Sequence, residues 1–83
     1  MEPAKQFGEI IRRLRQQAEL TQEELAFRAG MNVTYLSDIE RGRSMPSLAI
    51  IIDLARGLEA HPSELLRDLQ IDGAPLPRKR PTT

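Results

Sequence analysis

Residues 21–42, TQEELAFRAGMNVTYLSDIERG, decide the fold of this 83-residue chain. Thr21 is followed three residues later by Glu24, which is the pattern of a capping box, so a helix is expected to begin at Gln22. Gly30 stands where a residue in the left-handed conformation would end that helix after about two turns. The first part of the stretch therefore predicts a short helix with a defined start and a defined end.

A second short helix is expected after the turn. Asn32 is a suitable N-cap, and Gly42 repeats the glycine stop. Leu36 and Ile39 give this helix an inward side. Helices this short are marginal alone, so the pair needs packing partners, and the small Ala26 lets two helices approach closely. The rest of the chain must supply that core.

Apolar residues at helical spacing predict three further helices, over about residues 3–18, 48–58 and 62–69. A proline stands at the first position of the first and the last of these helices, where its missing N–H costs nothing, and Ser47 can cap the middle one. The chain is thus expected to be a single all-α domain. The residues at helical spacing are Phe7, Ile10, Ile11, Leu14 and Ala18 in the first of these helices, the inward-facing Leu48, Ile51, Ala55 and Leu58 in the second, and Leu65, Leu66 and Leu69 in the short last one.

Composition excludes several classes of function. Cysteine is absent, which excludes disulfides and cysteine-based metal or nucleophile sites. No apolar run is long enough for a signal peptide or a membrane span, so a cytoplasmic protein is expected. His61 is the only histidine and the glycines stand singly, so no catalytic cluster or phosphate loop is apparent. We expect no enzyme activity, no cofactor and no small-molecule ligand.

The formal net charge is zero, which at first argues against a nucleic-acid partner. The distribution of charge matters more than its sum. Basic residues cluster in three places and acidic residues gather near the C-terminal end, so basic and acidic poles can lie on opposite sides. The basic residues are Arg12, Arg13 and Arg15, then Arg41 and Arg43, then Arg78, Lys79 and Arg80; the acidic residues are Glu59, Glu64, Asp68 and Asp72.

The motif LTQEELAFRAGMNVTYLSDIERGRSMPS, residues 20–47, resembles the Cro/repressor-type helix-turn-helix family, also called XRE-like. The shared features are a Gln at the first helical position, the Ala and Gly of the turn, and the closing Glu-Arg-Gly. The resemblance extends back to IIRRLR at residues 10–15 and forward to PSLAIIIDLARGLEAHPSELL at residues 46–66, and it covers roughly residues 7–69. The chain departs from the family at Glu59, where glycine is frequent, so the end of the fourth helix is less sharply specified.

The resemblance implies a compact five-helix lambda-repressor-like domain over residues 7–71, with the helix-turn-helix motif at residues 22–41. Residues 72–83, which include GAPLPRKRPTT, are expected to be a disordered tail. Such a motif places its second helix in the major groove of double-stranded DNA, so residues 33–41 are the expected recognition helix.

The outer face of this helix is expected to read base edges. Hydroxyl groups can bond several bases, an apolar side chain can contact a thymine methyl group, and Asp38 can accept from a cytosine amino group. The alternative for Thr34 and Asp38 is a solvated polar pair one turn apart, and Tyr35 can instead bind a phosphate or pack on the preceding helix. The predicted base-contacting residues are Val33, Thr34, Tyr35, Ser37 and Asp38.

Most of the affinity is expected to come from phosphates. Gln22 lies at a helix N-terminus, where free N–H groups and the helix dipole favour an anion, and the resemblance implies that it holds a DNA phosphate. Arg41, Arg43 and Ser44 follow the recognition helix, where the family again meets the backbone; the alternative is an ordinary solvated loop. Asn32 has a structural role as N-cap, to which a phosphate contact would be additional.

The resemblance also implies a structural ion pair between Arg15 and Glu40, which would tie the first helix to the end of the third. If this pair is buried, removing one partner would leave an uncompensated charge at a cost of about 3 to 5 kcal/mol, while replacing both with apolar groups would cost little. Both residues are therefore kept apart from the DNA-contacting set.

Specific DNA binding by one such domain usually needs two copies, with half-sites about one helical turn apart. The three isoleucines at residues 50–52 cannot all face one core, and the family tends to have a polar residue at Ile50, so Ile50 is expected to be exposed unless a partner covers it. The alternative is that these residues cover the underside of a monomer's core. The predicted dimer interface consists of Ile50, Leu66, Leu69 and Ile71.

The sequence thus predicts a sequence-specific transcriptional regulator that acts as a homodimer on a (pseudo)palindromic operator. The alternative is an antitoxin or adaptor, in which the same fold mainly binds another protein through its C-terminal half. Steep salt dependence of duplex binding would support the regulator, and a co-purifying basic partner would support the adaptor.

Overall fold

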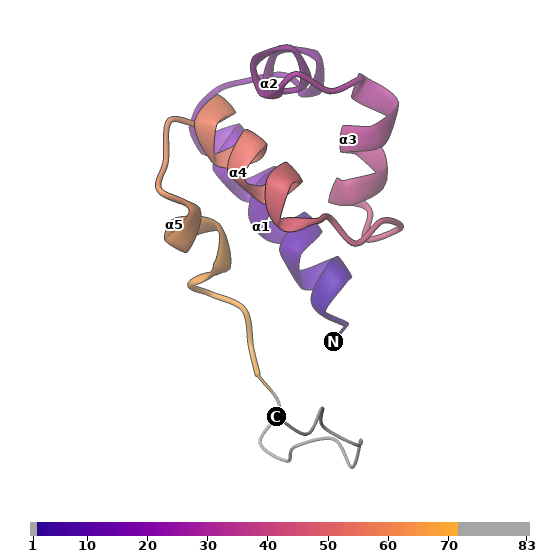
Figure 1. Cartoon of the computed structure of the whole chain (residues 1–83), viewed down its shortest axis with the longest axis vertical. Helices are drawn as coiled ribbons and strands as arrows, with labels where there is room; N and C mark the ends of the chain where they lie inside the picture. Colours follow the sequence, from indigo (N-terminus) through magenta and orange to yellow (C-terminus); the bar gives the residue numbers. More distant parts are fainter. Residues whose placement is uncertain (1, 72–83) are drawn as a thin grey trace, which may run out of the picture.

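The computed structural model describes residues 2–71, so the predicted tail at residues 72–83 lies outside the described residues. Within that range every regular element is a helix, which confirms the predicted all-α fold. The predicted boundaries hold within one residue except in the last helix, which ends in a turn at Leu66 instead of reaching Leu69. Figure 1 shows the helices in chain order: α1 Pro3–Gln17, α2 Gln22–Ala29, α3 Val33–Glu40, α4 Leu48–Gly57 and α5 Pro62–Leu66.

Two reciprocal hydrogen bonds start α2. The N–H of Glu24 donates to Thr21 Oγ1 at 3.0 Å, and the N–H of Thr21 donates to Glu24 Oε1 at 2.8 Å, which is the predicted capping box. The backbone hydrogen bond from Thr21 holds the pKa of Glu24 below its ordinary value. Because the folded-state pKa is lowered, the contribution of this carboxylate to stability is present at neutral pH and is lost as the pH falls through the lowered pKa.

The turn between α2 and α3 depends on Gly30, whose φ is 71°. This left-handed conformation is inexpensive for a residue without Cβ, and it lets the N–H of Met31 return to the carbonyl of Ala26 at 3.0 Å. Asn32 then caps α3, because its Oδ1 accepts from the N–H of Tyr35 at 2.8 Å. The turn thus fixes the direction in which α3 leaves α2.

The end of α4 is made without glycine. Glu59 takes the left-handed conformation with a φ of 54°, and the N–H of Ala60 donates to the carbonyl of Ala55 at 2.9 Å. The helix end is therefore sharply defined, at a conformational cost of about 1 kcal/mol that a glycine would avoid. Glu19 does the same after α1, with a φ of 59°.

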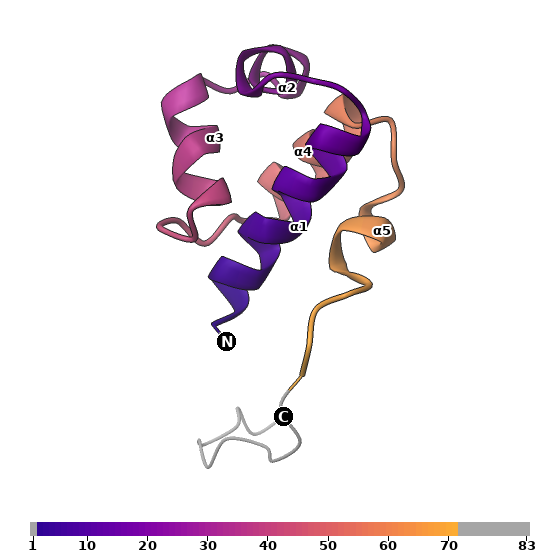
Figure 2. The same cartoon turned by 180° about the vertical axis from the view of Figure 1, so that it is seen from behind.

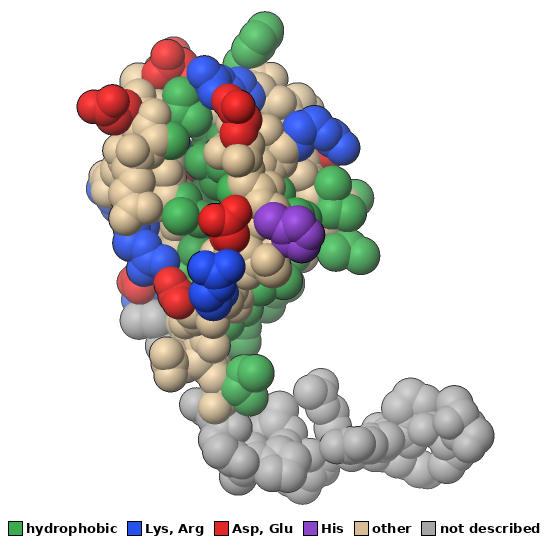
Figure 3. All heavy atoms as spheres, turned by 90° about the vertical axis from the view of Figure 1, so that its left-hand side faces the viewer, with side chains coloured by type: hydrophobic (Ala, Val, Ile, Leu, Met, Phe, Trp, Pro, Cys, Tyr) green, Lys and Arg blue, Asp and Glu red, His purple; other side chains and the backbone are tan. Residues whose placement is uncertain are grey.

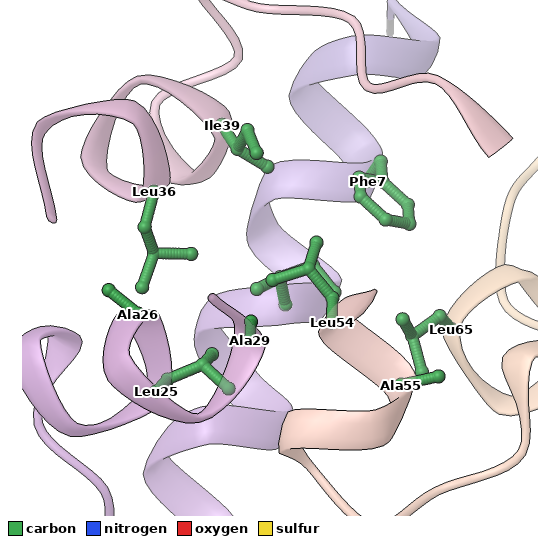
Figure 4. Packing of buried hydrophobic residues seen from close by; sticks show 10 residues of the cluster. Phe7, Leu25, Ala26, Ala29, Leu36, Ile39, Leu54, Ala55 and Leu65 are labelled. Carbon is green, nitrogen blue, oxygen red and sulfur yellow. The ribbon is translucent and has the colours of Figure 1, made fainter. Parts of the chain in front are cut away.

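The hydrophobic core gathers side chains from all the described helices (Figure 4). α1 packs on α3 and α2 packs on α4, while α5 covers α1 and α4 through the fully buried Leu65. The prediction that Leu48 faces inward is wrong, since its side chain is 69% exposed. Ala55 is buried as predicted, and Leu54, which was not predicted to face inward, is fully buried beside it.

α1 and α3 approach each other most closely at Gly8. A Cβ at this position would overlap the carbonyl oxygen of Ile39 and would lie 2.6 Å from the carbonyl oxygen of Glu40. Both are backbone atoms, so no side-chain rotation can relieve the contact. The missing side chain at Gly8 therefore sets the distance between the two helices.

Gly8→Ala is expected to push α1 away from α3 and to lower the free energy of unfolding by about 3 kcal/mol. Urea denaturation at an unchanged m-value would measure the loss. Gly30→Ala is the matched control, because a Cβ there meets no atom within 4 Å and only the positive φ is strained, at about 1 kcal/mol. A smaller loss at Gly8 than at Gly30 would contradict the expected packing constraint.

Candidate nucleic-acid interface

α3 lies on the opposite side of the molecule from α5 (Figures 1 and 2) and presents an outer face along its length. Thr34 is exposed and Val33 is 38% exposed, both in the first turn of the helix. Tyr35, Ser37 and Asp38 are half-buried, and Tyr35 packs against the core. Of the five predicted base-contacting residues, the first two are therefore the most open to a ligand.

A shallow depression of about 470 Å³ lies where α1, the start of α2 and the end of α3 meet. Gln22 lines it from the first position of α2, where the first backbone N–H groups have no partner within the helix. Ser37 lines it from α3, so its hydroxyl group is grouped with Gln22, which was predicted to bind a phosphate. The charged residues around the depression are Arg12, Arg15, Glu23, Glu40 and Arg41.

Arg12 was not among the DNA-contacting residues predicted from the sequence. It is exposed and lines the same depression as Arg41, although the two residues belong to different helices. The available signal was its position three residues before Arg15, because residues three apart lie on the same face of a helix. The structure thus adds a cation from α1 to the candidate interface.

A buried ion pair lies beneath this depression. The side chain of Glu40 is only 3% exposed, and Arg15 holds it with two bonds, from Nε to Oε2 at 2.7 Å and from Nη2 to Oε1 at 3.1 Å. The third nitrogen of Arg15, Nη1, donates to the carbonyl of Leu20 at 2.8 Å. The guanidinium group therefore compensates the buried carboxylate and also fixes the chain just before α2.

Gln22 joins this pair, which the sequence did not indicate. Its Nε2 donates to Glu40 Oε1 at 3.0 Å across a separation of 18 residues. No local pattern predicts a contact at that separation, because it depends on how α2 and α3 are packed. The carboxylate of Glu40 thus accepts from both α1 and α2.

The loop after α3 carries two exposed cations, Arg41 and Arg43, and the half-buried Ser44. Gly42 turns the chain with a φ of 76°, and the N–H of Arg43 donates to the carbonyl of Asp38 at 2.8 Å. These two features hold the loop against the end of α3. The predicted phosphate-contacting cations therefore lie on an ordered turn beside the outer face of α3.

Among residues 2–71 the charges do not separate into the two predicted poles, while Asp72, Arg78, Lys79 and Arg80 lie outside the described residues. Arg13 on α1 pairs with Asp68 at 2.8 Å, and Arg28 on α2 pairs with Glu59 at 3.4 Å. The four side chains are between 48% and 81% exposed, so each pair contributes little to stability. The pairs neutralise arginines that lie outside the depression and outside the loop after α3.

A second surface, on α4, α5 and the segment that follows, exposes apolar side chains. Ile52 is 40% exposed, Leu66 is 39% exposed and Ile71 is 91% exposed, and Figure 3 shows hydrophobic side chains gathered along one edge of this part of the molecule. The prediction that Ile50 is the exposed isoleucine is wrong. Ile50 packs partly against the core, as Leu69 does, and Ile52 lies on nearly the opposite side of the helix because it is two residues further along.

The described residues provide neither a metal site nor a membrane-crossing helix, and they give His61 no role beyond a structural one. Among residues 2–71, no three side chains of His, Cys, Asp or Glu are arranged to hold a metal ion. None of the described helices combines the length and apolar character needed to cross a membrane. His61 has a structural role, because its Nδ1 accepts from the N–H of Ser63 at 3.1 Å at the start of α5.

Comparison with known proteins gives consistent matches. A family model described as Helix-turn-helix matches residues 11–65. An uncharacterised HTH-type transcriptional regulator, y4dJ of Sinorhizobium fredii, is 39% identical over 66 residues, which are 80% of this chain and 86% of the relative. Control protein C.BamHI of Bacillus amyloliquefaciens is 39% identical over 61 residues, which are 72% of this chain and 75% of the relative.

Solved structures agree with these relatives. The restriction-modification controller protein C.AhdI from Aeromonas hydrophila has a TM-score of 0.73 at 40% identity, over 75% of this chain and 94% of that chain. The clp gene regulator ClgR from C. glutamicum has a TM-score of 0.77 at 27% identity, over 81% of this chain and 87% of that chain. The arrangement of helices therefore recurs, over at least three quarters of this chain, in proteins named as a regulator and a controller.

Glu40→Ala is expected to lower the free energy of unfolding by about 3 to 5 kcal/mol, because Arg15 would keep its charge without a partner. The double variant Arg15→Met/Glu40→Leu removes both charges and keeps the volume, so it should stay within about 1.5 kcal/mol of the wild type. Urea denaturation of the three proteins would measure the difference. Equal losses in the single and the double variant would show that the buried charge is not the source of the effect.

Proposed function

The chain belongs to the helix-turn-helix family of transcriptional regulators, and on this premise we propose that it acts as a homodimer on a two-fold symmetric DNA site. As a member of that family it is a DNA-binding regulator and not an enzyme. The observation that carries the proposal is the placement of two features along α3: its first turn is exposed, and its later residues line the polar depression at Gln22. One part suits base edges and the other suits phosphates.

Base reading is assigned to the first turn of α3, which enters the major groove. Thr34 supplies a hydroxyl group that donates or accepts, and Val33 supplies an apolar contact for a thymine methyl group. Asp38 lies one turn further along and accepts from a cytosine amino group. Tyr35 packs partly against the core, so it is assigned a contact to the DNA backbone or a packing role beneath the base-reading residues. Ser37 lines the depression, which favours a phosphate contact.

Phosphate binding is assigned to two places that flank α3. Gln22 and the N–H groups at the first two positions of α2 form one of them, since the N–H of Glu24 is already used by Thr21. Arg41, Arg43 and Ser44 form the other, on the loop that Gly42 turns. The amide nitrogen of Asn32 is a further donor, since its Oδ1 is used in capping α3. Together these groups would set the register of α3 on the duplex.

Dimerisation is assigned to the apolar surface around Ile52 and Leu66, with Ile71 at its edge. Because α5 lies opposite α3, contacts through this surface leave the recognition helix of each copy free. Two copies related by a two-fold axis would then present their recognition helices to half-sites about one helical turn, or about 34 Å, apart. A DNA-bound regulator of this kind works in the compartment that holds the DNA, so we place it in the cytoplasm.

Selection of bound sequences from random duplex DNA tests the proposal most directly. The wild type is expected to enrich a two-fold symmetric site. Thr34→Ala should change the preferred base at one position in each half-site, because a base contact is removed. Gln22→Ala should leave the sequence unchanged and weaken binding by about 10-fold for each protomer, because a phosphate contact is removed.

Arg67→Ala is the matched control, since Arg67 is an exposed arginine after α5, away from α3. It should change neither the selected sequence nor the affinity, whereas Arg43→Ala should lower the slope of log K against log salt by about 1 for each protomer. No enriched sequence at low salt would overturn the proposal. The fold would then serve as an antitoxin-like or adaptor-like module, and partners of the surface on α4 and α5 should be sought.

Ile52→Glu with Leu66→Glu should shift the protein from dimer to monomer and raise the dimer dissociation constant by about 100-fold or more, because each protomer would bury two charges at the interface. Sedimentation equilibrium would measure this shift. Phe27→Glu is the control, because Phe27 is 87% exposed on α2, outside the proposed interface. A wild type that is monomeric at all concentrations, or an equal effect of Phe27→Glu, would contradict the assignment.

A further inference from the structure

The hydrogen bond between Gln22 and Glu40 links a predicted DNA contact to a buried charge. Gln22 Nε2 donates to Glu40 Oε1 at 3.0 Å, and the side chain of Gln22 is half-buried at the edge of the depression. Glu40 cannot turn away, because its other two contacts, both with Arg15, hold the carboxylate at 2.7 and 3.1 Å. The acceptor offered to Gln22 is therefore fixed in place.

The fixed carboxylate of Glu40 determines whether the nitrogen or the oxygen of the Gln22 amide points toward it. A primary amide carries two N–H donors on its nitrogen and an acceptor on its oxygen, and the two ends have nearly the same shape. A carboxylate only accepts, so it binds the NH₂ end and excludes the carbonyl end. One N–H is then used by Glu40, and the second N–H stays available for another acceptor.

A DNA phosphate also only accepts, so it needs the same end of the amide. Without Glu40 the amide could turn its carbonyl oxygen toward the phosphate, and that arrangement is repulsive. Binding would then also carry the entropy cost of fixing the Gln22 side chain in one rotamer. With Glu40 in place the donor is already oriented. Binding is stronger when groups need no reordering at the moment of contact.

The negative charge of Glu40 does not oppose this arrangement, because Arg15 compensates it with paired hydrogen bonds. The side chain of Glu40 is 3% exposed, whereas three exposed charged residues line the depression, the cations Arg12 and Arg41 and the carboxylate Glu23, so positive charge is in excess around it. A phosphate at this position would thus meet cations and an oriented amide, with the carboxylate buried behind them.

We propose that Glu40 is a positioning residue for DNA binding, which acts by holding the amide of Gln22 with its second N–H directed at a backbone phosphate. The proposal rests on the phosphate contact assigned to Gln22 in the proposed function. It gives the ion pair of Arg15 and Glu40 a second role beside the structural one. Its distinctive consequence is energetic coupling between the two residues: the contribution of Gln22 to DNA affinity should fall once Glu40 no longer orients its amide.

A double-mutant cycle on DNA affinity measures this coupling. Gln22→Ala is made in the wild type and in the background Arg15→Met/Glu40→Leu, which removes the carboxylate without leaving an unpaired charge. Binding of each protein to the selected duplex is measured at one salt concentration by titration. The expected loss from Gln22→Ala is about 10-fold per protomer in the wild type and at most about 2-fold in the background without Glu40.

Arg43→Ala is the matched control in both backgrounds. Its exposed side chain lies on the loop after α3 and is part of none of the contacts of Glu40. It should weaken binding by the same factor with and without Glu40, whereas a purely structural loss would change both effects alike. Circular dichroism melts would establish that each variant is folded at the temperature of the titration.

A second measurement is made on the wild type and needs only the folded Gln22→Ala variant for assignment. The side-chain NH₂ signals of Gln22, identified as the pair missing in Gln22→Ala, should be shifted from ordinary values in the free wild type and should move further when DNA is added. Equal effects of Gln22→Ala in both backgrounds, or ordinary NH₂ shifts in the free protein, would overturn the positioning role while leaving the regulator intact. A wild type that binds no duplex would remove the proposed function itself, and the positioning role with it.

Discussion

One buried carboxylate holds three helices at a single point. Glu40, at the end of α3, accepts from Arg15 of α1 and from Gln22 of α2, and Arg15 also fixes the carbonyl of Leu20 before α2. A charge this deeply buried is tolerable only when its acceptor capacity is filled. The relative placement of the three helices is therefore tied to one set of hydrogen bonds, and the recognition helix inherits its position from them.

Helix packing supports the same arrangement from the other side. Gly8 brings the backbone of α1 against the end of α3, next to the carbonyl of Glu40, so the ion pair and the closest approach of two helices occur together. α5 closes the core on the far side through Leu65. The domain thus has two separate regions: the contacts of Glu40 with Arg15 and Gln22 lie beneath the depression, and the apolar surface on α4 and α5 lies away from it.

Local rules predicted much of this structure from the sequence. The capping box at Thr21, the left-handed Gly30 and the cap at Asn32 were each predicted and are each confirmed, because they depend on residues only a few positions apart. The resemblance predicted the family, which the comparisons confirm. It also implied the ion pair between Arg15 and Glu40, which is present in the structure. Contacts that depend on tertiary packing were missed. The hydrogen bond from Gln22 to Glu40 was not predicted, and Ile50 was predicted to be exposed although it packs partly against the core, because a pattern of adjacent isoleucines does not fix the rotation of α4.

The pairing of Arg13 with Asp68 and of Arg28 with Glu59 bears on how this protein would search a chromosome. Attraction to arbitrary DNA grows with the number of phosphates that free cations can neutralise. Arginines already matched by carboxylates add little to it, and the formal net charge of the chain is zero. Such a protein would spend little time on DNA outside its own site, so most molecules would stay free in solution. Occupancy of the site would then follow closely the rate at which the protein is made and removed.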